Sequence, residues 1–419
     1  MYRSLLSAVV LAAACIASPL QAAEPVTTIN FWHYQTSNRE VLTRTIKEFE
    51  AANPDIKVQE LFKDLTNLAT DIQAARMVDR APDVAQVLAR LTIGMVESSN
   101  PVPLDSGPDK GAFLAGIAPN FLATGIYKGH PYAVPQSFGT PVLYINKDIF
   151  RAAGLDPEKP PRTWQEVREQ ALQIKQKTGK YALFISTGGR DVGPQQMIVN
   201  AGADMLSEDF TRATFATPDA IAAMQLWQDM AVTDKSLAIF TERENQSLFM
   251  AGQIGMMVTS IASFQGAQRN AKGVFDLDVA HYPTWGDKPR RVPNSGASLM
   301  LFSENPKRRE AAFRFLAHMM KPEVTNQWAV ESGYLPIAPG AKDADIVRAY
   351  IAKEPRWGVA VAQMDDLVST ARWPGTRVVE IQIVLENMVS ALWQGKGKAS
   401  VLVPAAEKEI TRLIAAGTN

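Results

Sequence analysis

The sequence predicts an α/β protein whose two lobes are joined by extended crossings and face each other across a cleft. Patterns of β-strand and α-helix alternate through most of the chain, which is typical of parallel sheets covered by helices. Extended segments with Pro and Gly interrupt this alternation at two places, as a hinge between lobes would. The 419 residues are also too many for one hydrophobic core, which favours two domains.

The N-terminus carries the three parts of a secretory signal peptide in order. Arg3 gives a positive start, Leu5 to Ala17 is almost wholly apolar, and the small residues Ala22 and Ala23 follow. A membrane-spanning helix needs roughly 18 or more apolar residues, whereas this run ends after about 13. We therefore expect a signal peptide at 1–22, cleaved after Ala22 or Ala23, and a periplasmic mature protein.

Cys15 is the only cysteine and lies inside this predicted signal peptide. The mature chain would then hold no disulfide, thiolate nucleophile or cysteine metal ligand. An alternative stays open, because Leu11 to Cys15 loosely resembles a lipobox, in which Cys15 would become a lipidated first residue. Small residues fit just before the cysteine, but Ala12 stands where a larger aliphatic residue is usual.

Charge and motif content argue against several classes of function. The 43 basic and 43 acidic residues balance, so we expect no nucleic-acid partner and no anionic membrane. The histidines spell no zinc motif, and neither a G-x-S-x-G elbow nor a G-x-x-x-x-G-K-[ST] loop occurs. We expect no metal, no cofactor and no enzymatic activity. A secreted glycosidase stays a remote alternative, since two of the 43 acidic residues would suffice if they lay about 5 to 10 Å apart in one cleft.

The start of the mature chain predicts a β-α-β unit. Residues 27–32 (TTINFW) alternate and are rich in strand formers, and residues 41–49 place apolar side chains at helical spacing. Residues 56–62 (IKVQELF) form the next strand. A similar pattern follows, with a helix at 68–77, a strand at 83–88 and a helix at 112–122. Short extended pieces broken by Pro and Gly then make the first crossing.

The alternation continues beyond this crossing. Thr163 and Glu166 form a capping box that opens a helix ending at Gly179. A second extended crossing at 292–302 precedes a helix that has Pro306 at its start. The other predicted elements are a strand at 181–186, helices at 218–230 and 244–251, a strand at 254–259, and a mainly helical segment at 324–419.

These patterns divide the mature chain into two lobes and three hinge crossings. The first lobe is expected at 23–136 and about 298–325, and the second at about 141–293 and 331–419. The crossings are expected at 137–140, 294–297 and 326–330.

Several separated segments resemble the family 1 extracellular solute-binding proteins, the group that includes maltose-binding protein. The matches run in order along the mature chain, and among them are 31–33 (FWH), 49–58 (FEAANPDIKV), 81–84 (APDV), 141–150 (PVLYINKDIF), 249–257 (FMAGQIGMM) and 333–336 (GYLP). The resemblance implies a periplasmic-binding-protein type II fold. It also implies a monomer that captures a solute and delivers it to the permease subunits of an ABC importer; a subunit that feeds a sensory receptor would have the same cleft.

Within this family, three segments look most like the branch that binds glycerol-3-phosphate and its diesters: 154–164 (GLDPEKPPRTW), 333–337 (GYLPI) and 392–396 (LWQGK). The chain departs from that branch at Thr66, Ala89 and Gly139, where polar or aromatic side chains are expected. We therefore predict a sugar or polyol ligand, with glycerol-3-phosphate or a glycerophosphodiester as the alternative.

Four aromatic side chains are candidates for ligand contact. Trp164 stands at the mouth of a helix, where its face would suit a sugar ring, although the same position suits a hydrophobic staple. Tyr334 matches a position that often faces ligand in the resembled family, and its Gly and Pro neighbours also suit a structural role. His33 and Tyr34 follow the first strand, at the edge where open α/β sheets place ligand loops.

Backbone and charged groups complete the predicted site. Ser295 and Gly296 lie on the second crossing, where glycine lets backbone N–H groups approach a ligand, or simply permits a hinge turn. Arg372 and Arg377 would each suit bidentate pairing with a phosphate, unless both are solvated surface residues. Asp83 either contacts ligand or caps the start of its strand.

Overall fold

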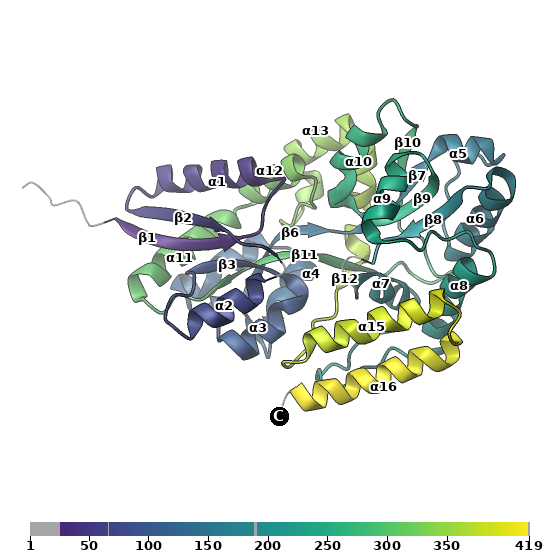
Figure 1. Ribbon diagram of the computed structural model, residues 1–419. Helices are drawn as coiled ribbons and strands as arrows, with labels where there is room; N and C mark the ends of the chain where they lie inside the picture. The colour runs from purple at the N-terminus through teal and green to yellow at the C-terminus, as the bar shows by residue number, and fades with distance from the viewer. Residues whose placement is uncertain (1–25, 66, 188–190, 418–419) are drawn as a thin grey trace, which may run out of the picture.

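The computed structural model describes residues 26–65, 67–187 and 191–417, without the side chains of Lys110 and Ser295. The expected signal peptide with Cys15 therefore lies outside the described residues, as does Thr66. Two sheets organise the rest of the chain (Figure 1). Within the described ranges, no helix combines the length and the apolar character needed to cross a bilayer.

The first lobe is built on a sheet with the strand order β12-β11-β3-β1-β2, and β6 pairs with the free side of β11. Strand β1 runs parallel to β2 and β3, whereas β11 is antiparallel to β3 and β6. Ile29 and Phe31 are fully buried on β1, and the ring of Phe31 packs edge-on against Phe315. The strands are β1 (Thr27–His33), β2 (Ile56–Phe62), β3 (Val84–Leu88), β6 (Ala133–Gly139), β11 (Val292–Leu301) and β12 (Leu367–Ser369).

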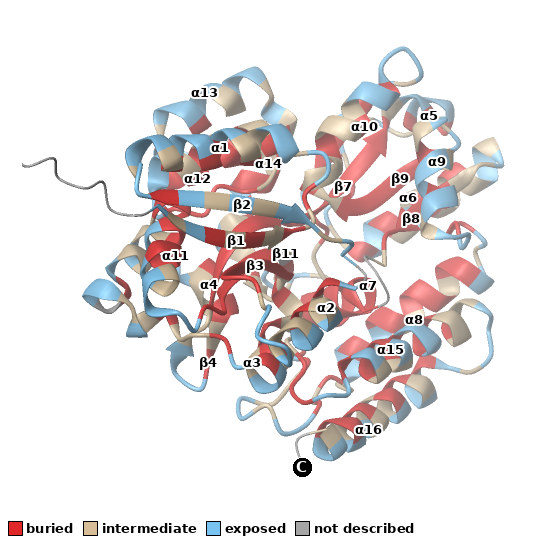
Figure 2. Cartoon of the chain, turned by 60° about the vertical axis from the view of Figure 1, so that its left-hand side comes forward, coloured by how far each residue is buried: buried red, intermediate tan, exposed pale blue. Residues whose placement is uncertain are grey.

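Helices cover both faces of this sheet (Figure 2). They are α1 (Arg39–Ala52), α2 (Leu68–Arg76), α3 (Thr92–Ser99), α4 (Pro119–Leu122), α11 (Pro306–Met319) and α12 (Pro322–Ser332). The helix expected at 112–122 is instead a 3-10 helix, η3 (Pro108–Gly116), followed by the short α4, because Pro119 starts a new helix. A small hairpin joins β4 (Ile126–Tyr127) to β5 (His130–Pro131).

The second lobe has a four-stranded sheet in the order β10-β7-β9-β8. Its strands are β7 (Pro141–Asn146), β8 (Tyr181–Ile185), β9 (Ile254–Ser260) and β10 (Leu277–Ala280). Its helices up to the second crossing are α5 (Lys147–Ala152), α6 (Trp164–Thr178), α7 (Val192–Asn200), α8 (Pro218–Val232), α9 (Glu242–Met250) and α10 (Phe264–Ala271). Later helices join it, and α15 and α16 lie side by side below it (Figure 1).

These later helices are α13 (Asp345–Lys353), α14 (Pro355–Ala362), α15 (Val378–Trp393) and α16 (Ala399–Gly417). Single-turn 3-10 helices occur at η1 (Ala89–Leu91), η2 (Leu104–Ser106), η4 (Ala123–Gly125), η5 (Ile261–Ser263), η6 (Ala341–Asp343) and η7 (Met364–Asp366).

Capping residues fix where two helices of the second lobe begin. The Oγ1 of Thr163 accepts a hydrogen bond from the Glu166 N–H (3.2 Å) at α6, but the Glu166 carboxylate accepts from the N–H of Arg162 (2.6 Å). The predicted box is therefore half formed at this helix. A complete capping box stands at α9 instead, between Thr241 and Glu244.

The chain crosses between the lobes where β6 continues into β7 and where β11 enters the first sheet. Residues 326–330, expected as a further crossing, lie within α12, which runs from Pro322 to a left-handed glycine cap at Gly333. The chain leaves the first lobe after that cap. On the way, the Leu335 N–H donates to the carbonyl of Phe138 (2.8 Å).

At the crossing, β11 and β6 approach each other closely. A Cβ atom added to Gly296 would lie 2.1 Å from the carbonyl oxygen of Ser137. That oxygen belongs to the strand backbone, so it is unable to move aside without breaking the pairing of β6 with β11. Glycine is therefore required at position 296, because any larger residue would clash with the Ser137 carbonyl oxygen.

We predict that Gly296→Ala destabilises the protein by about 1 to 3 kcal/mol, the usual cost of overpacking. Gly266→Ala is the matched control, since its Cβ would meet nothing within 4 Å on helix α10, and it should stabilise by about 0.5 to 1 kcal/mol. Urea denaturation of both variants measures the difference. Equal unfolding free energies for the two variants would contradict the close approach.

Candidate functional site

A cavity of about 230 Å³ lies at the hinge and is called the inner cavity here. Gly139 and Gly296 bound it from the crossings, and Tyr334 bounds it from the turn after α12. The second lobe supplies mainly hydroxyl and amide groups. The other lining residues are Thr140, Pro141, Ser186, Val192, Gln196, Thr259, Ser260 and Ala262.

The topology explains why these hydroxyls meet. Strands β8 and β9 are parallel neighbours, so their carboxyl ends lie at the same edge of the sheet. Ser186 directly follows β8, and Thr259 and Ser260 end β9. Ligand loops of open α/β sheets gather at this edge. A Cβ atom on Gly139 would lie 2.3 Å from the Ser260 Oγ, so glycine there lets the crossing contact the second lobe.

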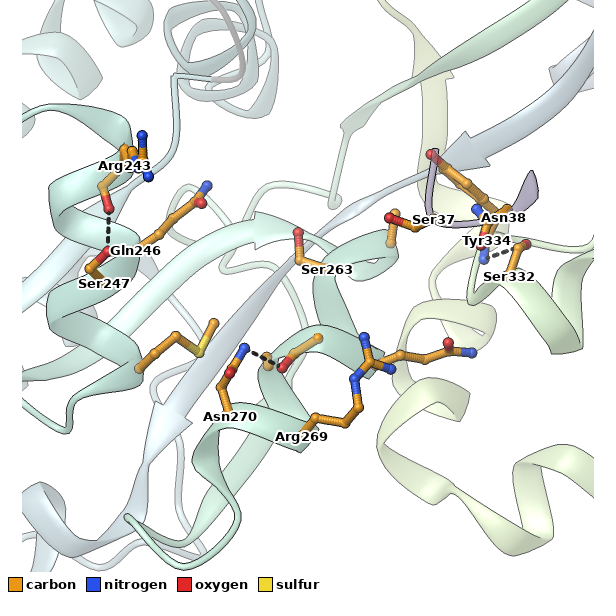
Figure 3. A pocket seen from close by; sticks show the side chains of 15 residues that line it. Ser37, Asn38, Arg243, Gln246, Ser247, Ser263, Arg269, Asn270, Ser332 and Tyr334 are labelled. Carbon is orange, nitrogen blue, oxygen red and sulfur yellow. Dashed lines mark hydrogen bonds between the residues drawn. The ribbon is translucent and has the colours of Figure 1, made fainter. Parts of the chain in front are cut away.

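A larger space of about 640 Å³, the outer cavity, is lined by the side chains drawn in Figure 3. Tyr334 and Ala262 line both, so the two cavities adjoin. One wall comes from the segment before α1 and from the end of α12, and the other from α9 and α10. Its lining residues are Ser37, Asn38, Arg243, Gln246, Ser247, Met250, Ala262, Ser263, Gln265, Gly266, Ala267, Arg269, Asn270, Ser332 and Tyr334.

Among the described residues, the outer cavity is positively charged and the inner cavity is neutral. Arg243 and Arg269 line the outer cavity, while neither cavity has a described Asp or Glu on its wall. Glu242 stands nearby, but its carboxylate accepts hydrogen bonds within the second lobe. The donors are the Ser186 hydroxyl (2.6 Å), the Thr187 N–H (3.2 Å) and the Gln246 amide (3.0 Å).

A buried ion pair joins the two lobes beside the inner cavity. The Nε of Arg90, in η1, lies 3.4 Å from Oδ1 of Asp191, which precedes α7. Burial raises the pKa of Asp191, and the neighbouring Arg90 charge opposes that shift. The other carboxylate oxygen accepts from Gln195 (2.9 Å) and from the Trp373 indole (3.3 Å). The carboxylate is thus held by groups from several elements.

Two tyrosines lie near this pair. Tyr34 follows β1, and burial raises the pKa of its hydroxyl, with Tyr334 as the next contributor and Arg90 acting in the opposite direction. The Tyr34 N–H donates to Gln86 (3.1 Å), and the Gln86 amide donates to Gln136 (2.5 Å). Tyr334 and Arg90 thus act electrostatically on Tyr34, and of the three only Tyr334 lines the cavities.

Trp164 lies in the core of the second lobe and not at a ligand surface, which corrects the expectation of sugar stacking. Its side chain is 0 % exposed. The indole N–H donates to Asn200 (3.2 Å), and the ring packs edge-on against Tyr282 at 5.5 Å between centroids. The physical reason is core packing: the indole at the start of α6 lies against Tyr282 and bonds Asn200 inside the hydrophobic core.

His33 and Asp83 are also buried and already engaged. The Nδ1 of His33 accepts from the Gln35 N–H (3.2 Å), and burial lowers its pKa more than the nearby Glu60 raises it. The Asp83 carboxylate accepts from the Asn30 N–H (2.8 Å) and the Ser303 hydroxyl. Asp83 precedes β3, at the opposite end of that strand from the cleft, so it holds the fold and does not line either cavity.

Neither of the two candidate arginines lines either cavity. Arg372 donates to the carbonyls of Thr124 (3.1 Å) and Ile126 (2.6 Å). Burial lowers its pKa to about 10, so the guanidinium stays charged at neutral pH. Arg377 is exposed and pairs with Glu380 at 3.0 Å. Neither arginine is placed to bind a phosphate in the cleft, which corrects that expectation.

Of the remaining expected positions, Gly296 and Tyr334 line the inner cavity, and Gly139, noted as a departure, does so too. The backbone of Ser295 pairs with Gly139, but its side chain lies outside the described atoms. Ala89 is buried in η1. Among the described residues, no three His, Cys, Asp or Glu side chains gather into a metal site.

Sequence reasoning missed most of the groups that line the cavities. Ser186 and Ser260 end or follow predicted strands. Because ligands of open α/β sheets bind at the carboxyl ends of the strands, this position was the signal that could have indicated them. Arg243 lies within the capping box of α9, which indicates a helix start and no ligand, and Arg269 lies on α10 with no motif around it. Only their place on the cavity wall reveals both.

A family model described as "Bacterial extracellular solute-binding protein" matches residues 44–355. The chain is 28% identical over 395 residues to the sn-glycerol-3-phosphate-binding periplasmic protein UgpB of Escherichia coli K12, covering 89% of each chain. Among solved structures, the cyclic alpha-maltosyl-1,6-maltose binding protein of Arthrobacter globiformis aligns with a TM-score of 0.83 and 23% identity, over 94% of this chain and 100% of that one.

A second structure, UgpB of Mycobacterium tuberculosis in complex with glycerophosphocholine, aligns with a TM-score of 0.78 and 22% identity, over 95% of this chain and 100% of that one. At sequence identities below 25%, the similarity to these two structures supports the fold alone. The two-lobe α/β fold class predicted from the sequence is confirmed by these neighbours.

We predict that Trp164→Ala lowers the free energy of unfolding by about 3 to 5 kcal/mol, because a large buried side chain leaves a cavity. Chemical denaturation of the unliganded protein measures this loss. Trp285→Ala is a control, since Trp285 is only partly buried and should cost clearly less. Unchanged stability together with lost ligand affinity would instead indicate that Trp164 contacts the ligand.

Proposed function

Because the chain belongs to the family of bacterial extracellular solute-binding proteins, we propose that it captures a sugar or polyol between its lobes and passes it to the permease subunits of an ABC importer. One observation carries the choice of ligand: hydroxyl and amide side chains line the inner cavity from the second lobe, opposite Tyr334 and the two hinge glycines. We further propose that the protein binds its solute as a monomer, without chemical change.

The inner cavity suits a polyhydroxylated ligand. Thr259 and Ser260 line it with hydroxyls, and Gln196 adds an amide. Thr140 and Ser186 add two more hydroxyl oxygens, of which Thr140 already accepts from Gln363 and Ser186 already donates to Glu242. Tyr334 offers an aromatic face with a polar tip. A sugar ring or glycerol backbone would exchange its water hydrogen bonds for these groups. The name of the Arthrobacter relative, a maltosyl-maltose binding protein, points the same way.

Glycerol-3-phosphate or a glycerophosphodiester is the second candidate. The names of the Escherichia coli and Mycobacterium tuberculosis relatives favour it. Arg243 and Arg269 on the wall of the outer cavity favour it as well, since a phosphate needs charge-assisted hydrogen bonds when it loses water. Arg372 is unable to serve while it holds the two carbonyls of the first lobe.

Binding and signalling would share the same contacts. We propose that the lobes move about the crossings at 137–140 and 294–297, and that a ligand held from both sides stabilises the closed state. Closure would bring Tyr334 and the first-lobe residues Ser37 and Asn38 nearer to α9 and α10. The importer would then recognise the closed pair of lobes.

We also propose that residues 1–22 direct export to the periplasm, as their charged, apolar and small-residue segments indicate. Mass spectrometry of protein recovered from the periplasm should find a mature N-terminus at Ala23 or Glu24. A diacylated first residue at Cys15 would instead establish the lipoprotein alternative.

We predict that the true ligand class raises the melting temperature and compacts the protein. At 100 times Kd the native state gains roughly 2.7 kcal/mol, which should raise the melting temperature by several degrees. A thermal-shift panel of sugars, polyols and glycerophosphodiesters identifies the class. Small-angle scattering with that ligand should then show a smaller radius of gyration, and an unchanged radius would contradict closure.

A further inference from the structure

The two lobes also meet on the side of the crossings that lies opposite the outer cavity. Figure 1 and Figure 2 both place α10 and α12 above strands β6 and β11, and α3 and α15 below them. The outer cavity is lined from α9, α10 and the end of α12. A rotation of one lobe about the crossings that narrows this cavity therefore increases the separation of α3 from α15.

The segment 370–377, called the strap here, is fixed to the second lobe. The amide oxygen of Gln195 on α7 accepts a hydrogen bond from the Thr370 hydroxyl (3.0 Å). The indole N–H of Trp373 donates to Asp191 (3.3 Å), and the Trp373 side chain is fully buried. The strap continues into α15, which packs against α8 and α16. The strap is thus part of the second lobe.

Two residues of the strap nevertheless bind the first lobe. The Arg372 guanidinium donates to the carbonyls of Thr124 (3.1 Å) and Ile126 (2.6 Å), at the end of η4. The Gly375 N–H donates to the carboxylate of Glu97 on α3 (2.6 Å). Each of these hydrogen bonds joins one lobe to the other. Because hydrogen bonds weaken steeply with distance and angle, separation of α3 from α15 must weaken them.

A third contact comes from Phe210, in the loop between α7 and α8 of the second lobe. Its ring packs edge-on against Tyr127 of the first lobe, at 6.1 Å between centroids, and the Arg372 guanidinium lies 5.7 Å from its ring centroid. The Tyr127 hydroxyl donates to Glu97 (2.6 Å), so these four side chains form one cluster across the lobes. The φ of Phe210 is 59°, a left-handed conformation that strains a bulky residue.

The cluster contains a positive charge that is costly to withdraw from water. Burial lowers the pKa of the Arg372 guanidinium, and no Asp or Glu among the described residues forms an ion pair with it. Two carbonyls and the face of Phe210 are its observed partners. Desolvation offsets much of such an attraction, so its net contribution is small. Water can replace the carbonyls when the lobes separate here, which lets the cluster open at low cost.

We propose that Arg372, Phe210 and Glu97 form a clasp that opposes closure of the cleft and thereby limits the affinity for the solute. This inference rests on the proposed function and adds a conformational control to the same site. Ligand contacts in the two cavities must outweigh the clasp before the closed state predominates. The apparent affinity is then the affinity of the closed state, reduced by the fraction of unliganded molecules that are closed.

Distances between two spin labels measure that closed fraction without any ligand. The labelled chain carries Cys15→Ala, so that only the introduced cysteines react. One label is attached at Glu40→Cys on α1 and the other at Lys272→Cys, directly after α10. Both positions are exposed and lie on opposite lobes. Closure of the outer cavity should shorten the distance between them.

The clasp is removed by Phe210→Ala and Arg372→Met, made singly and together. Methionine keeps an apolar stem but has no donor for the two carbonyls. The matched control is Arg377→Met, because Arg377 lies on the same strap, is exposed, and pairs with Glu380 on α15. Melting temperatures verify that each variant folds. Phe210→Ala removes only a half-buried loop side chain, so it tests the clasp even where Arg372→Met is unstable.

Without ligand, the clasp variants should show the shorter distance in more molecules than the control does. By titration calorimetry, they should bind the solute found by thermal shift roughly threefold or more tightly. Folded variants with the distances and affinity of the control, or with weaker binding and longer distances, would overturn the clasp. Absence of binding by every sugar, polyol and glycerophosphodiester would overturn the proposed function, whereas the unliganded distances would still decide whether the clasp opposes closure.

Discussion

Strands β6 and β11 lie so close at the crossing that the backbone of one leaves no room for a side chain on the other. Gly296 meets this constraint, and Gly139 meets a second one against Ser260. Together they let the second lobe's sheet edge come up to the crossings, where the hydroxyls that follow β8 and β9 can face Tyr334. A side chain at Gly296 would separate β6 from β11 within the first sheet, and one at Gly139 would clash with the Ser260 hydroxyl of the second lobe. The walls of the inner cavity thus depend on both glycines.

Charged groups near the start of α15 also connect the two lobes. Asp191 forms an ion pair with Arg90 of the first lobe, and its carboxylate accepts a hydrogen bond from the indole N–H of Trp373, in the segment before α15. One residue earlier, Arg372 donates to two carbonyls of the first lobe. Buried ion pairs contribute modestly to net stability, because desolvation offsets their attraction, and removing one partner is costly. We interpret these contacts as fixing how the lobes meet, while hydrophobic packing stabilises each lobe.

The sequence predicted the alternation of strands and helices well, because each β-α-β unit is a local pattern. Strand β1 and helix α6 begin within a residue or two of their expected starts. The site was predicted less well, since the destination of a side chain depends on partners far along the chain. The capping residue Thr163 located Trp164 at a helix start, but only the packing of Tyr282 against it shows that the indole points into the core. Arg372 was expected in a polar loop, and its carbonyl partners lie 246 and 248 residues away.

Arginines line the outer cavity, whereas neutral groups line the inner one, which forms the base of the cleft. The cost of removing water from a charge accounts for this difference. Hydrogen bonds from hydroxyls and amides are directional and need no counterion, so they keep their value when closure removes water. An unpaired guanidinium at the base would make closure without ligand costly and would bind any small anion. In the outer cavity, Arg243 and Arg269 are exposed to solvent. Under the proposed function, the hydroxyls and amides of the inner cavity would orient the solute, while the guanidiniums of the outer cavity would stay in contact with water.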